Sequence, residues 1–147
     1  MAYRSMRLVL DTSVVVKAVR NFRGASAALI AEALEGRVTL LVSTPLWLEY
    51  EAVVTRPEHW VWPGFGAEDA ERFLSLLAPL CEPVDIAFKW RGFLADPDDD
   101  MVVEAALNGR ADALATFDQQ GFAAAAEQFG LVLQRPDAIL AQLRNRP

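Results

Sequence analysis

The chain has 147 residues, 53% of them hydrophobic, and carries 20 acidic against 14 basic side chains, for a formal net charge of −6. This length and hydrophobic fraction exclude a disordered chain and predict one domain over residues 1–147. No apolar run in the sequence reaches the roughly 18 residues that a membrane-spanning helix needs, and the acidic balance argues against a broad, basic nucleic-acid surface.

The sequence favours a cytoplasmic location. Its one cysteine, Cys81, has no partner for a disulfide within the chain, so a reducing compartment is the default. The opening MAYRSMRLVLD is unlike a secretory signal peptide, because its apolar stretch is short and ends at an aspartate.

The first half of the chain alternates short apolar runs with helical stretches. In chain order we predict a strand at Arg7–Leu10, helices at Ser13–Val19 and Ala25–Glu35, a strand at Val38–Val42 and a helix from Thr44 to about Arg56. Thr44 is the expected N-cap of the last helix, since threonine favours that position and the following proline fits the first turn. The segment EHWVWPGFG then forms a loop.

The second half continues the alternation. In chain order we predict a helix at Ala67–Ala78, a short strand at Glu82–Val84, a helix at Ile86–Leu94, a helix that follows the ADPDDD loop and ends at Asn108, a strand at Ala113–Thr116, a helix at Phe122–Phe129, a strand at Leu131–Leu133 and a helix at Asp137–Leu143. Strands that alternate with helices predict an α/β domain with a mostly parallel sheet.

Two aspartates follow predicted strands. Asp11 ends the first strand in LVLDTSVVV, and Asp118 follows a later strand in ALATFD. Ligands of parallel α/β sheets gather at the carboxyl ends of the strands, so both carboxylates are placed for chemistry. The alternatives are structural: Asp11 caps the next helix, and Asp118 is a turn residue.

A glutamate lies on the apolar side of the helix that begins at Thr44. At about 100° per residue, Glu49 shares a face with Leu46 and Val53, whereas Glu51 falls on the opposite side. A carboxylate on an apolar stripe is costly unless it is paired or bound to a cation. The alternative is that Glu49 is an ordinary surface residue.

Four aspartates crowd before the helix that ends at Asn108: Asp96, Asp98, Asp99 and Asp100. Capping and the helix dipole explain one or two of them. The helical projection places Asp99 on the apolar face of this helix and leaves Asp100 and Glu104 off it. We therefore expect Asp99 to point inward, with Asp96 able to reach the same place.

Four carboxylates are thus candidates for one site. They are Asp11, Glu49, Asp99 and Asp118. Carboxylates that converge repel one another unless cations lie among them, and oxygen ligands select hard cations such as Mg²⁺ or Mn²⁺. With one histidine and one cysteine in the sequence, a zinc cluster is excluded.

Five stretches together resemble the PIN domain, in particular the bacterial PIN proteins of toxin–antitoxin pairs that are relatives of the VapC toxins. They are LVLDTSVVV, STPLWLEYEAVVTRP, DPDDDMVVEAAL, ADALATFD and LVLQRPDAIL, and they occur in the family's order over nearly the whole chain. The resemblance implies a single PIN-like domain with a parallel sheet of strand order 3-2-1-4-5, flanked by helices. That order would bring Asp11 and Asp118 together at the switch point.

The resemblance also implies roles for individual residues. The family's acidic quartet falls on Asp11, Glu49, Asp99 and Asp118. Ser13 takes the place of the hydroxyl or amide helper near the first aspartate, Thr116 matches the threonine before the last acid, and Asp96 supports the site. In the crowded DPDDD stretch, Asp96 and Asp100 are alternatives to Asp99.

The activity implied is that of an endoribonuclease that hydrolyses RNA phosphodiester bonds with Mg²⁺ or Mn²⁺. A cognate antitoxin partner and a homodimer or larger oligomer are expected with it.

One alternative is an inert PIN module that only binds a partner. Another is a phosphatase or phosphotransferase with Asp11 as nucleophile, although Ser13 stands where the haloacid-dehalogenase pattern has a second aspartate and no lysine follows Lys89.

Two further groups have open interpretations. Trp60, Trp62 and Phe65 form either an exposed surface for a partner or for base stacking, or a cluster that packs on the core. Lys17, Arg20 and Arg23 either contact RNA phosphates or are solvated charges on a helix surface.

Overall fold

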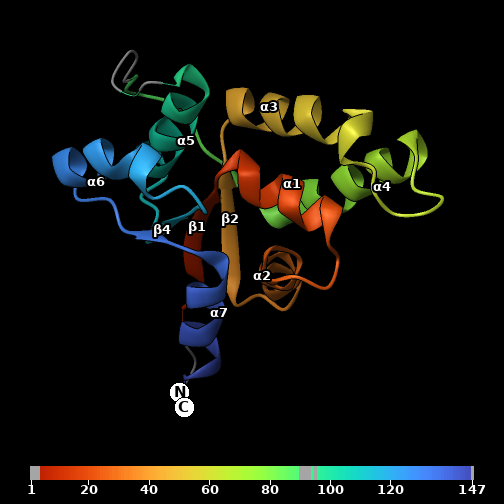
Figure 1. Ribbon diagram of the computed structural model, residues 1–147. Coiled ribbons are helices and arrows are strands. Elements are labelled where there is room, and N and C mark those ends of the chain that lie inside the picture. The colour runs from red at the N-terminus through yellow and green to blue at the C-terminus, as the bar shows by residue number, and fades with distance from the viewer. Residues whose placement is uncertain (1–3, 90–93, 95, 147) are drawn as a thin grey trace.

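The structure of the protein is a computed structural model that describes residues 4–89, 94 and 96–146. These residues form one α/β domain in which helices flank a five-stranded parallel sheet on both sides (Figure 1). The strand order is β3-β2-β1-β4-β5, so the predicted fold class and strand order are confirmed.

The strands are short and lie within a few residues of the predicted positions. They are β1 Met6–Leu10, β2 Val38–Val42, β3 Cys81–Pro83, β4 Ala113–Ala115 and β5 Leu133–Gln134. The helices are α1 Thr12–Arg20, α2 Ala25–Leu34, α3 Thr44–Val54, α4 Ala67–Leu77, α5 Pro97–Asn108, α6 Ala123–Phe129 and α7 Pro136–Arg144, with 3-10 turns η1 Pro57–His59, η2 Ala78–Leu80 and η3 Gln120–Phe122. None of the helices in these described ranges combines the length and apolar character needed to cross a bilayer.

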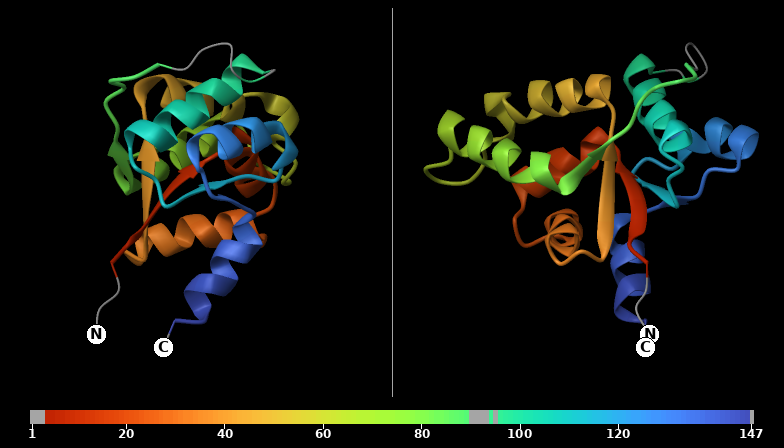
Figure 2. Two further views of the ribbon diagram at one scale, coloured as in Figure 1. Left: turned by 90° about the vertical axis from the view of Figure 1, so that its left-hand side faces the viewer. Right: turned by 180° about the vertical axis from the view of Figure 1, so that it is seen from behind.

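The helices divide between the two faces of the sheet. α1 and α2 lie on one side, while α5 and α6 lie on the other, where α5 packs against β1, β2 and β4 (Figure 1). Two further views show α7 running beside α2 toward the end of the sheet where β1 starts, near which both ends of the drawn chain lie (Figure 2). α3 and α5 both begin near the opposite end, above the carboxyl ends of β1 and β2. This end of the sheet therefore collects the loops that carry the candidate site.

β1 is a central strand of the sheet and is enclosed on both faces. Leu8 and Val9 are both fully buried although their side chains point to opposite faces, as expected for a strand covered by helices on both sides. Such a strand is a rigid support for the residue that follows it, which is Asp11.

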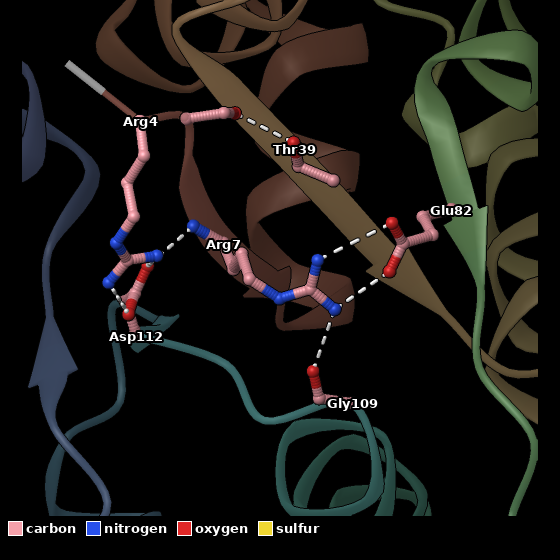
Figure 3. A network of polar contacts seen from close by, with 7 residues as sticks. Arg4, Arg7, Thr39, Glu82, Gly109 and Asp112 are labelled. Atoms are coloured by element: carbon pink, nitrogen blue, oxygen red, sulfur yellow. Dashed lines mark hydrogen bonds and ion pairs between the residues drawn. The ribbon is translucent and has the colours of Figure 1, made fainter.

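A polar network ties the strands together near the start of β1 (Figure 3). The Arg7 guanidinium donates to the Glu82 carboxylate on β3 at 2.7 Å and to the Gly109 carbonyl at 2.9 Å. Asp112 pairs with Arg4 at 2.7 Å and also accepts the backbone N–H of Arg7 at 2.8 Å. These contacts hold β1, β3 and the start of β4 in register at the end of the sheet remote from Asp11.

The predicted helix at Ile86–Leu94 is wrong for the described residues of that segment. Residues 86–89 are not helical, and 90–93 lie outside the described part of the chain. The reason is a side chain on α5: Asn108 accepts the backbone N–H of Phe88 through Oδ1 at 3.0 Å and donates to its carbonyl through Nδ2 at 2.9 Å. These bonds engage backbone groups that a helix would use, and they hold Phe88 against the end of α5 instead.

The predicted N-cap of α3 is also wrong by one residue. Ser43, not Thr44, has the extended backbone of an N-cap, and its Oγ accepts the N–H of Leu46 at 3.3 Å. Thr44 is the first helical residue. Serine and threonine are both good caps, so the sequence alone does not separate these neighbours.

Candidate functional site

Asp11 lies directly after β1 and is buried, with 6% of its surface exposed. β1 runs parallel to β4, and the N–H of Asp11 donates to the Ala115 carbonyl at 2.9 Å. Thr116 is therefore its neighbour across the sheet. The Oδ2 atom of Asp11 accepts hydrogen bonds from Ser13 Oγ and Thr116 Oγ1, each at 2.8 Å. Hydroxyls from α1 and from the end of β4 thus fix the orientation of this carboxylate.

The capping alternative for Asp11 is supported in part, because the backbone N–H groups of Thr12 and Ser13 act on its carboxyl and lower its pKa. Asp11 stands at the N-cap position of α1, but within the described residues its side chain makes no capping hydrogen bond. Burial raises the pKa of Asp11, and the hydrogen bonds from Ser13 and Thr116 offset part of this rise. A buried carboxylate held by hydroxyls is costly for stability, which is typical of a residue kept for function.

Asp99 lies in the first turn of α5 and is half-buried. Burial and the negative charges of Asp11, Asp96, Asp118 and Asp98 raise the pKa of its carboxyl from 3.8 to about 7. Such an effect requires these carboxylates to be near, because charge interactions fall off with distance and are screened by solvent. Asp99 therefore lies close enough to Asp11, after β1, and Asp118, after β4, for both negative charges to act on its carboxyl.

Asp118 is exposed and lies two residues beyond Thr116. Its N–H donates to Thr116 Oγ1 at 2.9 Å, so one hydroxyl contacts both aspartates. Its carboxylate accepts the N–H of Gly121 at 3.0 Å and occupies the space that a Cβ on Gly121 would need. Asp118 is therefore a turn residue, as the structural alternative predicted. Its negative charge also raises the pKa of Asp99.

Glu49 lies on α3 and is half-buried, whereas Glu51 is exposed, in agreement with the helical projection. Burial raises the pKa of Glu49, the charges of Asp98 and Asp96 raise it further, and Arg56 lowers it. Glu49 thus faces the first turn of α5 from across the mouth of the site.

Tyr50 is a residue that the sequence did not single out. Its buried hydroxyl donates to the carbonyl of Leu10 at 2.6 Å, immediately before Asp11. This bond fastens α3, and with it Glu49, to the end of β1. A tyrosine among the apolar residues of a helix gives no signal of such a role in the sequence.

The crowded aspartates of α5 differ in their surroundings. Asp96 is the exposed N-cap and accepts the N–H of Asp98 at 3.0 Å, which is the capping role expected for one of them. Asp100 and Glu104, predicted to lie off the buried face, are buried, with 2% and 1% exposed. That part of the projection is wrong, because α5 is buried on a second side as well, where Asp100 accepts the N–H of Leu94 at 3.2 Å.

The structure thus brings the predicted site residues to one end of the sheet in two linked groups. Asp11, Ser13, Thr116, Asp99 and Asp118 form one, and Glu49 faces Asp96 and Asp98 in the other. Within the described residues, no three His, Cys, Asp or Glu side chains are gathered closely enough to hold a metal ion as they stand. The donors are carboxylate and hydroxyl oxygens, which suit a hard cation. Their assignment as metal ligands stays a prediction.

The aromatic loop packs inward rather than standing free. The Trp60 indole donates to the Val54 carbonyl at 3.0 Å, and Trp60 and Phe65 pack against the core. Trp62 stacks on Phe22 with ring centroids 5.5 Å apart. The geometry therefore favours the packing interpretation over a base-stacking surface.

Comparison with known proteins gives two findings. The family model of the PIN domain matches residues 7–120. Among solved structures, the chain is similar to one described as the crystal structure of VapBC2 from Rickettsia felis bound to a DNA fragment from their promoter, with 17% identity and a TM-score of 0.62, over 88% of this chain and 98% of that chain. At this identity the likeness shows the fold. The search of curated proteins found no match.

Proposed function

Because this chain belongs to the PIN domain family, we propose that it is a ribonuclease that hydrolyses RNA phosphodiester bonds with Mg²⁺ or Mn²⁺. PIN domains are generally nucleases that use a divalent metal. The observation that carries the proposal is Asp11, a buried carboxylate held at a strand end by hydroxyls from two elements, in the electrostatic field of Asp99.

We assign the cation to the four acidic residues, with Ser13, Thr116 and Asp96 in support. The ligands are Asp11, Glu49, Asp99 and Asp118. The raised pKa of Asp99 supports this assignment, because burial and then the negative charges of neighbouring aspartates disfavour the ionised carboxyl, and a cation would offset those charges.

The residues of the chain have distinct tasks in this proposal. A bound divalent cation supplies positive charge that makes water a better nucleophile and offsets charge on the phosphate. Ser13 and Thr116 both donate to Asp11, so they favour its ionised form and fix its orientation. The Asp99 carboxyl holds a proton up to about pH 7 without metal, and it must release that proton to become a ligand.

We further propose that the protein is the toxin of a toxin–antitoxin pair, acting in the cytoplasm as a homodimer or larger oligomer with a small antitoxin as partner. The likeness to VapBC2 of Rickettsia felis, described as bound to a fragment of promoter DNA, supports this proposal. Co-expression with the product of the neighbouring reading frame, followed by purification of a stable complex that no longer cleaves RNA, tests it.

The test of the nuclease proposal is cleavage of a mixed RNA pool by the purified chain. We expect cleavage with Mg²⁺ or Mn²⁺, none in EDTA, and a loss of at least about 10²-fold in Asp11→Asn, equivalent to about 2.7 kcal/mol of transition-state stabilisation. Activity that persists in EDTA or in Asp11→Asn at wild-type level would rule out the proposed site.

One observation favours an inert PIN module as the second candidate. The described carboxylates do not form a ready-made metal cluster. An inert module would bind its partner without cleaving RNA under any divalent metal, so the same assay separates the two. Membership of the PIN family argues against the phosphatase alternative.

A further inference from the structure

Two basic side chains meet over one aromatic ring beside the acidic site. The Lys17 ammonium lies 5.6 Å from the centroid of the Phe117 ring, and the Arg135 guanidinium carbon lies 5.1 Å from it. Lys17 and Arg135 are both exposed, and Phe117 is partly exposed. We call these three residues the Phe117 patch.

Three separate elements bring the patch together. Lys17 is on α1, Phe117 follows Thr116 at the end of β4, and Arg135 follows β5 at the start of α7. β5 is held beside β4 by the pairing of Gln134 with Ala115. The patch therefore depends on the tertiary fold and is not a local run of charge.

The patch adjoins the acidic residues directly. Phe117 lies between Thr116, which donates to Asp11, and Asp118, whose charge acts on Asp99. Lys17 is one helical turn after Ser13, so it lies on the same face of α1 at a rise of about 6 Å. A chain that places one phosphate at the acidic site would therefore bring its next phosphates over the patch.

The neighbouring cations of α1 do not share this position. Arg20 donates to the Glu58 carbonyl at 3.1 Å and contacts His59, both in η1. Arg23 lines a separate pocket with Arg144. Of Lys17, Arg20 and Arg23, Lys17 is therefore the residue that contacts Phe117.

The charges of the patch remain available to an anion. Within the described residues Lys17 makes no ion pair, and Arg135 forms one exposed pair with Asp137 at 3.2 Å through Nε. A guanidinium has five N–H donors, so this pair leaves others for a phosphate. Two like charges near one ring also repel each other, and a bound anion would relieve that repulsion.

We propose that the Phe117 patch binds the phosphate backbone of single-stranded RNA next to the scissile bond. This inference rests on the proposed nuclease function and assigns where that substrate is held. In a chain of net charge −6, the patch supplies the local attraction that the carboxylates do not. Phosphate contacts of this kind position a nucleic acid without reading its sequence.

The experiment measures the salt dependence of RNA binding by fluorescence anisotropy. The probe is a labelled single-stranded RNA of roughly ten nucleotides, with Mg²⁺ present and the monovalent salt varied from about 50 to about 200 mM. All proteins carry Asp118→Asn so that the RNA stays intact. Lys17→Gln and Arg135→Gln are compared with Arg72→Gln as a matched control. Arg72 is an exposed arginine on α4 that forms a similar local ion pair, with Asp69 at 3.3 Å.

We expect each patch variant to weaken binding several-fold and to reduce the slope of log K against log salt by about 0.7, the value for one phosphate contact to a single strand. Arg72→Gln should leave the slope unchanged. Mg²⁺ affinity, measured by calorimetry, should stay the same in all three, because none of these residues is a proposed ligand.

Three results would overturn the inference. One is an unchanged slope in both patch variants, and another is weaker binding with an unchanged slope, which would mean a structural effect. The third is an unchanged RNA slope with lost binding of a short polyglutamate peptide, which would assign the patch to an acidic protein segment. Separately, wild-type protein that binds RNA with the expected slopes but never cleaves it would overturn the nuclease proposal and leave the patch intact.

Discussion

Thr116 contacts both of the aspartates that follow strands, Asp11 and Asp118, through one hydroxyl group. Its hydroxyl donates to Asp11 and accepts the N–H of Asp118, with both partners within 3 Å. A single buried hydroxyl therefore sets the positions of two proposed ligands.

Thr116→Val should remove both bonds while keeping the shape of the side chain. We expect cleavage to fall about tenfold, a change of about 1.4 kcal/mol, and unfolding free energy to fall by roughly 1–2 kcal/mol. Thr116→Ser retains the hydroxyl and is the matched control. Kinetic assays and denaturant melts of both variants check this, and equal losses in the two would show that packing, not the hydroxyl, matters.

Asp99 should make the metal-free protein less stable as the pH rises. Its pKa is about 7 in the folded state and about 3.9 in unfolded chains, so the folded state binds this proton more tightly. The resulting stabilisation is complete below about pH 4 and is lost as the pH rises through about 7. In Asp99→Asn this dependence disappears.

We therefore expect Asp99→Asn in EDTA to be more stable than the wild type at pH 8, with a smaller difference at pH 5. After allowance for solvent screening at this half-exposed group, the gain at pH 8 is about 1 kcal/mol, or roughly 3 °C in Tm. Asp98→Asn, an exposed change in the same turn, is the control. A gain that is the same at both pH values would refute the raised pKa of Asp99.

At the scale of elements, α3 presents two glutamates to different surroundings. Glu49 faces the acidic turn of α5, whereas Glu51 is exposed to solvent. Glu49→Gln should lower cleavage by at least about 10²-fold, and Glu51→Gln should leave it near the wild-type level. The two changes are chemically identical, so the difference in cleavage depends only on the helix face that each residue occupies. Steady-state cleavage assays check both variants, and a loss in Glu51→Gln equal to that in Glu49→Gln would mean that the face of α3 is misassigned.

The limits of sequence reasoning are clearest in α5. A helical projection assumes one buried face and placed Asp99 on it; in the structure Asp99 is half-buried. It missed the burial of Asp100 and Glu104. Asp100 accepts the N–H of Leu94, which precedes the helix, and Asn108 at the other end of α5 bonds the backbone of Phe88 twenty residues away in sequence. Contacts of this range leave no periodic signal, and the same contacts override the helical pattern of Ile86–Leu94.

At the scale of the whole molecule, the strand order followed from a family resemblance rather than from the pattern of apolar residues. The apolar runs located the five strands of the described residues, and burial on both faces explains why β1, β2 and β4 read as continuous apolar runs. Their spatial order is set by crossovers and packing, for which the sequence pattern alone has no marker. The position of Asp11 next to Thr116 is a consequence of that order.

A cation should stabilise the entire domain if the carboxylates bind it. Mg²⁺ or Mn²⁺ at about 100 times its Kd adds about 2.7 kcal/mol to the unfolding free energy, which corresponds to a rise of roughly 5–10 °C in Tm. Thermal melts with each ion test this, with Asp11→Asn as the control that should not respond. No shift with either ion at millimolar levels, together with a response to Zn²⁺ alone, would refute a hard-cation site.

The hydrogen bond between Asp11 and Thr116 joins residues 105 positions apart. A ribosome releases the chain from its N-terminus, so Asp11 emerges 105 residues before Thr116, and Asp118 follows Thr116. A nascent chain that stops before β4 has β1 but lacks the hydroxyl and the second aspartate that complete the cluster. Under the proposed function, the RNA of the ribosome that makes this protein meets a finished nuclease only after the residues that follow β4 have been released and have folded against β1.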